Sequence, residues 1–267
     1  MTYREIKPPS ELRDVVRYFW ILEHDDQSQL PLRYKLFAES CPGLIFFYHS
    51  NYSMIAGQTY HHKEFMMPSR FGMIGAFLFP YSLPLLFGLP ANELTNSSVE
   101  LETLLGIEGC DVKEKITEAT NHRDRVDIIS AFLFSKLKKQ LTDDRGLQRC
   151  VRHIVQQQGN VPLDIISRNM GISHRQMERK FQLAVGMSPK LFSRLIRFSS
   201  TLRTFQDQSV MSLTDLSYRC GYFDQSHFIR DFKFFSGLSP KQYFKLKNTD
   251  VADNFIRISN NNSSMKF

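Results

Sequence analysis

Cysteine is scarce in this sequence. Only four of its 267 residues are cysteine, and no two of them form a Cys-x-x-Cys pair; they are Cys41, Cys110, Cys150 and Cys220. Cysteines spaced this widely predict neither a zinc cluster nor a disulfide framework. The adjacent residues His61 and His62 would point to opposite faces of a strand and could not easily share a metal ion. We therefore expect reduced thiols, no metal site and no cofactor.

Long apolar runs are also absent. Spanning a bilayer takes roughly 20 consecutive apolar residues, and no stretch of this chain approaches that length. The first residues, MTYREIKPPSELRD, contain no apolar core of a signal peptide. These absences predict a cytoplasmic protein without a membrane partner.

One pattern occurs twice towards the C-terminus. A shift of 51 residues places a first set of residues on a second, namely Met177, Arg179, Phe181 and Gly186 on Phe228, Arg230, Phe232 and Gly237. Upstream of each set the shift is 50, so that Gly171 matches Gly221. The difference of one residue falls in a turn, where an insertion is tolerated. The repeat predicts two helix-turn-helix units in tandem.

Each unit contains a helix with a marked beginning. The first, residues 173–185, starts with the Ser-x-x-Gln pattern of a capping box. The second, residues 224–236, starts with an aspartate that can accept hydrogen bonds from the free N–H groups of the first turn. In this second helix Phe228, Phe232 and Phe235 recur at the spacing of one buried face, which leaves a polar face outward. Such a helix is typical of proteins that read the major groove of DNA.

The motifs in these helices point to a known family. The first reads Ser173-His174-Arg175-Gln176-Met177-Glu178-Arg179-Lys180-Phe181, and the second runs from Gly221-Tyr222 to Pro240 and Tyr243. Both are similar to signatures of the DNA-binding domain of the AraC/XylS family of bacterial transcription regulators, and the resemblance covers residues 143–247. Cys220 departs from the alanine that the family often has there, and a small apolar thiol should pack similarly.

The resemblance implies a sequence-specific transcription regulator, and an activator, that reads two successive major-groove segments with helices 173–185 and 224–236. Its partners would be double-stranded DNA and RNA polymerase, while a small-molecule effector and a homodimer stay open. The implied base contacts come from His174, Arg175, Glu178, Arg179, Gln225, Ser226, Ile229 and Arg230. Candidates for phosphate contacts are Lys190, Lys233 and Lys241. The alternative for Arg179 and Arg230 is an ion pair that fastens the domain together.

Positive charge is concentrated in the same part of the chain. Residues 143–247 contain 17 Lys and Arg against 8 Asp and Glu, a net charge of +9, whereas the rest has 17 against 19, a net charge of −2. A basic domain attracts DNA because each neutralised phosphate releases condensed counterions. The distribution favours DNA binding by this part over a solvated basic face without a partner.

The N-terminal residues predict an α+β domain, with a small β-sheet or partial barrel and helices. Short apolar runs separated by Pro, Gly, Ser and Asn indicate strands at Leu32–Phe37, Gly43–Tyr48, Ser53–Gly57 and Phe71–Phe79. A helical pattern follows from Tyr81 and ends with a helix at Asn121–Leu141. The apolar stripe of that helix could pack on its own sheet or form a dimer surface. A looser resemblance links this region to an uncharacterised N-terminal domain of some AraC-type regulators, through Trp20, Ala38–Gly43, Phe79-Pro80, Phe87–Ala91 and Glu93-Leu94-Thr95.

These features divide the chain into three parts. Residues 1–142 are expected to form a sensor or dimerisation domain, residues 143–247 an all-α domain with both helix-turn-helix units, and residues 248–267 a polar, disordered tail. The alternative function is a DNA-targeted enzyme, such as a repair alkyl transferase fused to the same module, which needs an activated cysteine. Cys41 lies beside Pro42 without a nearby basic residue, and Cys110 lies near the acidic residues Glu108 and Asp111, so we expect no enzymatic activity.

Overall fold

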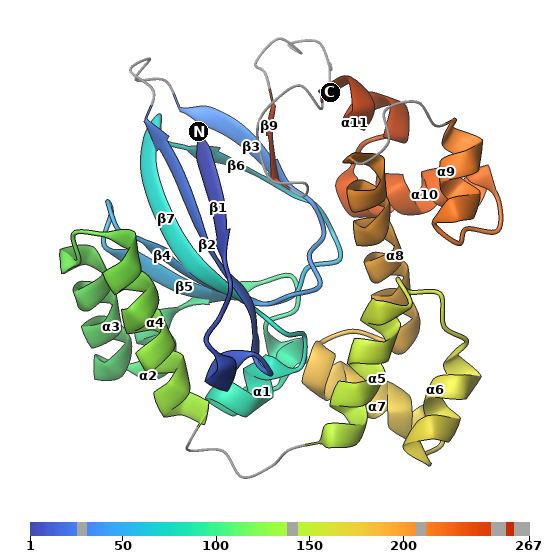
Figure 1. The fold of residues 1–267 in the computed structure, drawn as a ribbon, viewed down its shortest axis with the longest axis horizontal. Coiled ribbons are helices and arrows are strands. Elements are labelled where there is room, and N and C mark those ends of the chain that lie inside the picture. Colours follow the sequence, from blue (N-terminus) through green and yellow to red (C-terminus); the bar gives the residue numbers. More distant parts are fainter. Residues whose placement is uncertain (26–30, 138–143, 207–211, 247–254, 259–267) are drawn as a thin grey trace.

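The protein consists of a half rich in β-strands and a helical half. The computed structural model describes residues 1–25, 31–137, 144–206, 212–246 and 255–258. The strands and their accompanying helices lie on one side of the molecule, and the helices after residue 144 lie on the other (Figure 1). The expected fold class, an α+β region followed by an all-α region, is confirmed. None of the described helices is both long and apolar enough to cross a membrane.

The N-terminal half contains two open, antiparallel sheets. The larger has the strand order β1-β2-β7-β4-β5-β8, and its strands are β1 (Thr2–Ile6), β2 (Val16–Asp25), β7 (Arg70–Leu78), β4 (Gly43–Phe47), β5 (Tyr52–Ala56) and β8 (Ser98–Glu100). The smaller has the order β6-β3-β9, with β6 (Lys63–Met67), β3 (Leu32–Leu36) and β9 (Phe255–Ile258). The four strands expected between residues 32 and 79 are therefore present, with ends shifted by one residue.

Both faces of the larger sheet are covered. Helices pack on one face, where Phe19, Ile21 and Leu44 are buried together with side chains of α1 (Ser82–Phe87), α2 (Leu101–Leu105), α3 (Ile107–Glu118) and α4 (His122–Leu137). On the other face Trp20 and Leu22 are buried with Tyr34 of the smaller sheet. Because successive side chains of a strand point to opposite faces, β2 supplies both layers.

Helix α4 corresponds to the helix expected at residues 121–141. Its apolar stripe, Val126, Ile129, Phe132 and Leu133, is buried in the same core as the larger sheet. The structure therefore favours packing on its own sheet over a dimer surface for this stripe. Residues 138–141 of the expected helix lie outside the described residues.

The sequence predicted a disordered tail at residues 248–267, and this prediction is wrong for residues 255–258, which form β9. Residues Phe255–Ile258 pair antiparallel with β3, from Leu36 opposite Phe255 to Arg33 opposite Ile258. β3 pairs with β6 on its other side, so it offers a free edge of backbone N–H and C=O groups that a short extended segment can satisfy. The rest of the tail lies outside the described residues.

The helical half contains the two expected helix-turn-helix units and a connecting helix. Its first helix, α5 (Arg145–Gln156), precedes α6 (Leu163–Met170) and α7 (His174–Val185) of the first unit. The connector is α8 (Pro189–Gln206). The second unit contains α9 (Leu213–Arg219) and α10 (Gln225–Ser236), and α11 (Pro240–Leu246) follows.

The two halves share part of one core. Phe37, which follows β3, is fully buried among aromatic side chains of the helical half, with ring centroids 6.2 Å from Phe198 and 5.6 Å from Tyr243. The next residue, Ala38, donates its backbone N–H to the carbonyl of Phe235 at 3.0 Å. A separate folding unit at residues 1–142 stays a prediction, and these contacts show that its surface is matched to the helices.

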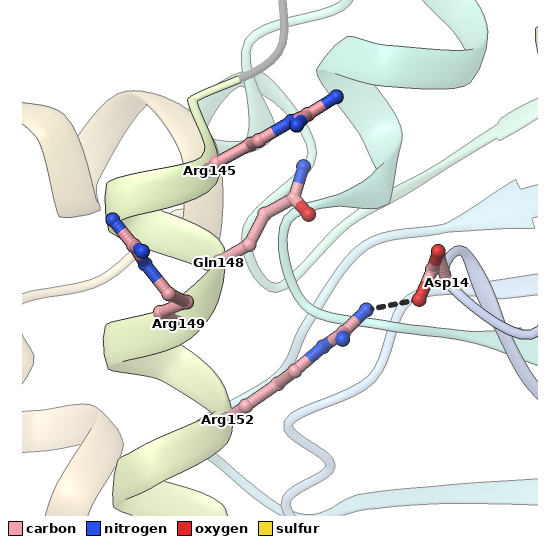
Figure 2. Close-up of a pocket in the computed structure, with 5 residues that line it drawn as sticks. All are labelled: Asp14, Arg145, Gln148, Arg149 and Arg152. Atoms are coloured by element: carbon pink, nitrogen blue, oxygen red, sulfur yellow. Dashed lines mark hydrogen bonds and ion pairs between the residues drawn. The ribbon is translucent and has the colours of Figure 1, made fainter.

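A polar contact joins the halves at α5. Arg152 donates to a carboxylate oxygen of Asp14 at 2.6 Å and to the hydroxyl of Tyr81 at 3.0 Å. Figure 2 shows Arg152 extending to Asp14, whereas Arg149 points away from it. These side chains, with those of Arg145 and Gln148, line a cavity of about 290 Å³. Asp14 and Arg152 are 138 residues apart in the sequence, so an analysis of local motifs could not show that they meet.

The two glycines that end α7 and α10 both touch the N-terminal half. Gly186 ends α7 and accepts a hydrogen bond at its carbonyl from the Thr95 hydroxyl at 2.7 Å. Gly237 ends α10, and a Cβ built on it would lie 2.5 Å from the His62 ring. Both residues have positive φ angles, +76° and +71°, and glycine adopts this backbone conformation readily because it has no Cβ. Two matching positions of the repeat therefore both contact the N-terminal half.

We predict that Gly186→Ala destabilises the protein more than Gly171→Ala. Both residues have positive φ, +76° and +63°, so each substitution strains the backbone by about 1–2 kcal/mol. At Gly186 the new Cβ would also lie 2.4 Å from the Thr95 hydroxyl and 2.9 Å from the Ala91 carbonyl oxygen, whereas at Gly171 it meets nothing within 4 Å. Overpacking of this kind adds about 1–3 kcal/mol. Urea unfolding measures the difference, and equal losses would contradict the docking at Gly186.

Candidate nucleic-acid interface

The beginning of α7 is determined by its cap. Ser173 accepts a hydrogen bond at its hydroxyl from the Gln176 backbone N–H at 3.3 Å, and the Gln176 side chain accepts one from the Ser173 backbone N–H at 2.9 Å. This confirms the capping box expected from the sequence. Met177 and Phe181 are fully buried, so the opposite face of α7 is turned to solvent.

The beginning of α10 is determined in the same way. The Asp224 carboxylate accepts a hydrogen bond from the His227 backbone N–H at 2.6 Å, as expected of its cap position. Phe228, Phe232 and Phe235 are fully buried, which confirms the predicted stripe. The two helices, α7 and α10, are called the reader helices below.

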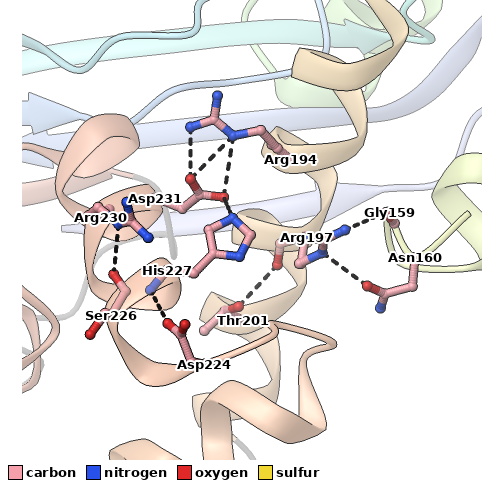
Figure 3. A network of polar contacts seen from close by, with 10 residues as sticks. All are labelled: Gly159, Asn160, Arg194, Arg197, Thr201, Asp224, Ser226, His227, Arg230 and Asp231. Atoms are coloured by element: carbon pink, nitrogen blue, oxygen red, sulfur yellow. Dashed lines mark hydrogen bonds and ion pairs between the residues drawn. The ribbon is translucent and has the colours of Figure 1, made fainter. Parts of the chain in front are cut away.

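An arginine of α8 joins the two units. Arg197 donates to the Gly159 carbonyl at 3.0 Å and to the Asn160 side-chain oxygen at 2.9 Å, both in the loop before α6 (Figure 3). Its guanidinium also lies over the ring of Tyr222, 5.3 Å from the centroid, in the turn before α10. Asn160 in turn donates to the Cys220 carbonyl at 3.4 Å. One side chain therefore contacts the loop before the first unit and the turn within the second.

One turn earlier on α8, Arg194 holds α10. It donates from Nη2 and Nε to Asp231 Oδ1, at 2.7 Å and 3.2 Å, and the Asp231 side chain is only 2% exposed (Figure 3). His227 Nε2 lies 3.6 Å from the other carboxylate oxygen. A carboxylate this deep in the protein needs such partners, because an unpaired buried charge is strongly unfavourable. Asp231 therefore fixes the rotation of α10 about its axis.

The candidate base contacts on α7 form an exposed face. His174, Arg175, Glu178 and Arg179 are all exposed. His174 Nε2 lies 3.1 Å from Asp164 of α6, an ion pair when the imidazole is protonated. Within the part of the chain that the structure describes, Arg179 forms no ion pair. The alternative role of Arg179, an ion pair that fastens the domain together, is therefore not seen among these residues.

The candidates on α10 differ more among themselves. Ser226 and Arg230 are exposed, and Arg230 donates to the Ser226 carbonyl at 3.4 Å. Gln225 is half-buried and accepts from the Thr214 hydroxyl at 3.2 Å. Ile229 packs partly against the apolar core and offers only part of its side chain outward. The sequence repeat could not separate Ile229 from the exposed positions, because it lies at the edge of the buried stripe.

The three candidate phosphate-binding lysines are exposed. Lys190 and Lys241 each follow a proline that begins a helix, α8 and α11 respectively, and Lys233 lies on α10. Free N–H groups at a helix beginning and a nearby cation both favour an anion. Lys190 and Lys241 match in the repeat, so the two units offer the same kind of contact.

The cysteines differ in their surroundings from what the sequence indicated. The expectation that Cys41 lacks a basic neighbour is wrong, because Arg17 Nη1 lies 3.4 Å from its sulfur. Arg17 is 24 residues away, which is why local sequence did not show it. Burial nevertheless raises the pKa of the Cys41 thiol, and Arg17 offsets this only in part. No cluster of three potential metal ligands occurs among the described residues.

Comparison with known families identifies two regions. Residues 4–100 match a domain of unknown function, DUF6597, and residues 166–246 match a family described as a helix-turn-helix domain. The second match covers both units built above. The C-terminal half therefore carries an AraC-type helix-turn-helix domain, which is the DNA-binding part of a transcription regulator.

Solved structures of one bacterial protein, ToxT, are similar to this chain. A structure of ToxT from Vibrio cholerae is 13% identical and has a TM-score of 0.45, with 92% of this chain and 98% of that chain covered. ToxT from Vibrio cholerae strain SCE256 with a bound unsaturated fatty acid is 11% identical and has a TM-score of 0.43, with 90% and 92% covered. No curated protein matches the chain.

We predict that Asp231→Ala destabilises the AraC-type domain. The substitution leaves Arg194 without its carboxylate, and Arg194 keeps 33% of its side chain in water. We therefore expect the free energy of unfolding to fall by about 3 kcal/mol, at the low end for breaking a buried pair. Asp127→Ala removes an exposed aspartate on α4 and should change it by less than about 0.5 kcal/mol. Urea unfolding of both variants tests this, and similar losses would contradict a structural role of the Arg194–Asp231 pair.

Proposed function

We propose that the two reader helices bind two successive major-groove segments and that the protein is an activator that works with RNA polymerase. The observation that supports the reading mode is the pair of matched, outward-facing arginines, Arg179 and Arg230, on two copies of one unit. An arginine can donate two hydrogen bonds to O6 and N7 of guanine. The other base contacts are assigned to His174, Arg175, Glu178, Gln225, Ser226 and the exposed part of Ile229.

The connector supports this arrangement. α8 has 18 residues, which at 1.5 Å per residue gives a rod about 27 Å long. One turn of B-DNA separates equivalent groove segments by roughly 34 Å. Arg194 and Arg197 prevent the units from rotating about α8, so both reader helices can engage the same face of the duplex.

The N-terminal half, residues 1–142, is proposed as the sensor or dimerisation domain. It contacts the ends of both reader helices at Gly186 and Gly237, so a change in its shape would alter how the readers are placed. A small-molecule effector and a homodimer are both compatible with this role. Sedimentation of the full chain with and without DNA would show the oligomeric state in which it acts.

The enzyme alternative has little support in the structure. An alkyl transferase needs an accessible thiolate. Cys41, Cys150 and Cys220 are buried, and burial raises the pKa of the Cys41 and Cys150 thiols. The partly exposed Cys110 donates to a carboxylate oxygen of Glu102 at 3.7 Å. Regulation by DNA binding therefore stands as the proposed function without a catalytic step.

We predict that Arg179→Ala and Arg230→Ala each relax base preference in a different half of the operator. Loss of a bidentate contact to guanine should weaken binding by roughly 1–3 kcal/mol at one position. Sites selected by each variant from a random duplex library give the measurement. Arg123→Ala removes an exposed arginine of α4 and serves as the control, with unchanged preferences. A uniform loss of affinity with unchanged base preferences would refute the assignment of both arginines as base readers.

We predict that Lys190→Ala weakens binding to all sequences about equally. A phosphate contact carries no base information, and its loss should reduce the slope of log affinity against log salt by about 1. Lys115→Ala removes the same charge from an exposed position on α3 and should leave the slope unchanged. Titrations of full-length protein into labelled duplex at several salt concentrations measure both slopes. Equal slopes for the two variants would remove Lys190 from the phosphate contacts.

A further inference from the structure

One large apolar side chain of the second unit lies in water. Phe223 is 86% exposed, the highest value for any large hydrophobic residue that the structure describes. It belongs to the turn between α9 and α10 and directly precedes Asp224, the cap of α10. A phenylalanine this exposed contributes little to the core, and its exposure to water is unfavourable.

The repeat shows that Phe223 is an addition to the turn. In the first unit Gly171 is followed by one residue, Ile172, before the cap Ser173, whereas in the second unit Gly221 is followed by two, Tyr222 and Phe223. Tyr222 takes the packing position of Ile172, because both residues pack on the same core and Tyr222 is only 3% exposed. Phe223 is the inserted residue, and it has no counterpart in the first unit.

The turn presents Phe223 on a fixed backbone. The N–H groups of Gly221 and Tyr222 donate to the carbonyls of Tyr218 and Ser217, each at 3.0 Å. The Tyr222 ring packs against Phe228 with a centroid distance of 5.3 Å, and Arg197 covers it. On the other side Asp224 is held by the His227 N–H. Both neighbours of Phe223 are therefore anchored, so the bond from its Cα to its Cβ points in a defined direction.

The position of Phe223 places it beside the base-reading residues. The first residues of a recognition helix reach base edges in the major groove, and Phe223 lies two positions before Gln225 and three before Ser226. The apolar group that the major groove offers is the C5-methyl of thymine, which phenylalanine can contact. The C-terminal half has a net charge of +9, so DNA is the partner that its charge favours for this surface.

We propose that Phe223 is a specificity residue that contacts the C5-methyl group of a thymine in the segment read by α10. The inference rests on the proposed function, since it needs α10 in the major groove. It gives the second unit a preference for thymine that the first unit lacks, because the first unit has no residue at the inserted position.

The test combines a protein variant with a change of one methyl group in DNA. The preferred duplex is first selected from a random library with the wild-type chain, and each thymine in the half that depends on Arg230 is then replaced singly by deoxyuridine. One replacement should weaken wild-type binding about fourfold, the contribution of one buried methyl group. Phe223→Ala should bind the original duplex roughly tenfold more weakly, as for the loss of a base-pair contact, and should no longer distinguish thymine from deoxyuridine at that position.

Two further variants separate this role from general effects. Phe223→Leu keeps an apolar side chain and should retain part of the thymine preference. Ile107→Ala removes an equally unusual exposed side chain, 81% exposed on α3, and should bind both duplexes as the wild type does. Thermal melting of Phe223→Ala should match the wild type, because the side chain has no core contacts.

Each remaining outcome decides the inference. If Phe223→Ala and the deoxyuridine replacement act independently, or if Phe223→Ala weakens all sequences equally, Phe223 does not read thymine while α10 stays in the groove. If Phe223→Ala binds DNA as the wild type does, the inference is overturned. If the wild-type chain selects no sequence at all, the proposed function fails first, and this inference fails with it.

Discussion

Arg197 is the contact on which the geometry of the DNA-binding half depends. Its guanidinium donates to Gly159 and Asn160 of the first unit and lies over Tyr222 of the second. Planar guanidinium groups suit this task because one face can cover a ring while the edge donates hydrogen bonds. With Arg194 bound to Asp231 one turn earlier, α8 controls both the distance between the units and the rotation of α10.

Much of the helical half could be predicted because its signals are local. The capping box at Ser173, the cap at Asp224 and the phenylalanine stripe of α10 each depend on residues within a few positions of one another. Helix beginnings, and therefore the faces that point outward, follow from such short-range hydrogen bonds. Arg197 could not be found in this way, since its partners lie 37 or 38 residues earlier in the chain.

The N-terminal half was harder to predict, and the reason differs between elements. β1 and β6 each contain two charged residues among five, most of their side chains stay partly or fully exposed, and β8 is only three residues long. The contacts with the helical half depend on backbone groups, such as the Ala38 N–H that binds the Phe235 carbonyl. Backbone donors have no side-chain signature, so no sequence pattern could indicate them. The exposure of Phe223 was hidden for a related reason, since an apolar residue beside a buried tyrosine looks like part of the core.

The strand β9 changes how the two halves can move. The chain leaves the sheet half after α4, builds the helical half and then returns to pair with β3. The helical half is therefore linked to the sheet half through the chain at both of its ends. These two links keep the facing surfaces of the halves at a high effective concentration even while individual contacts between them are broken.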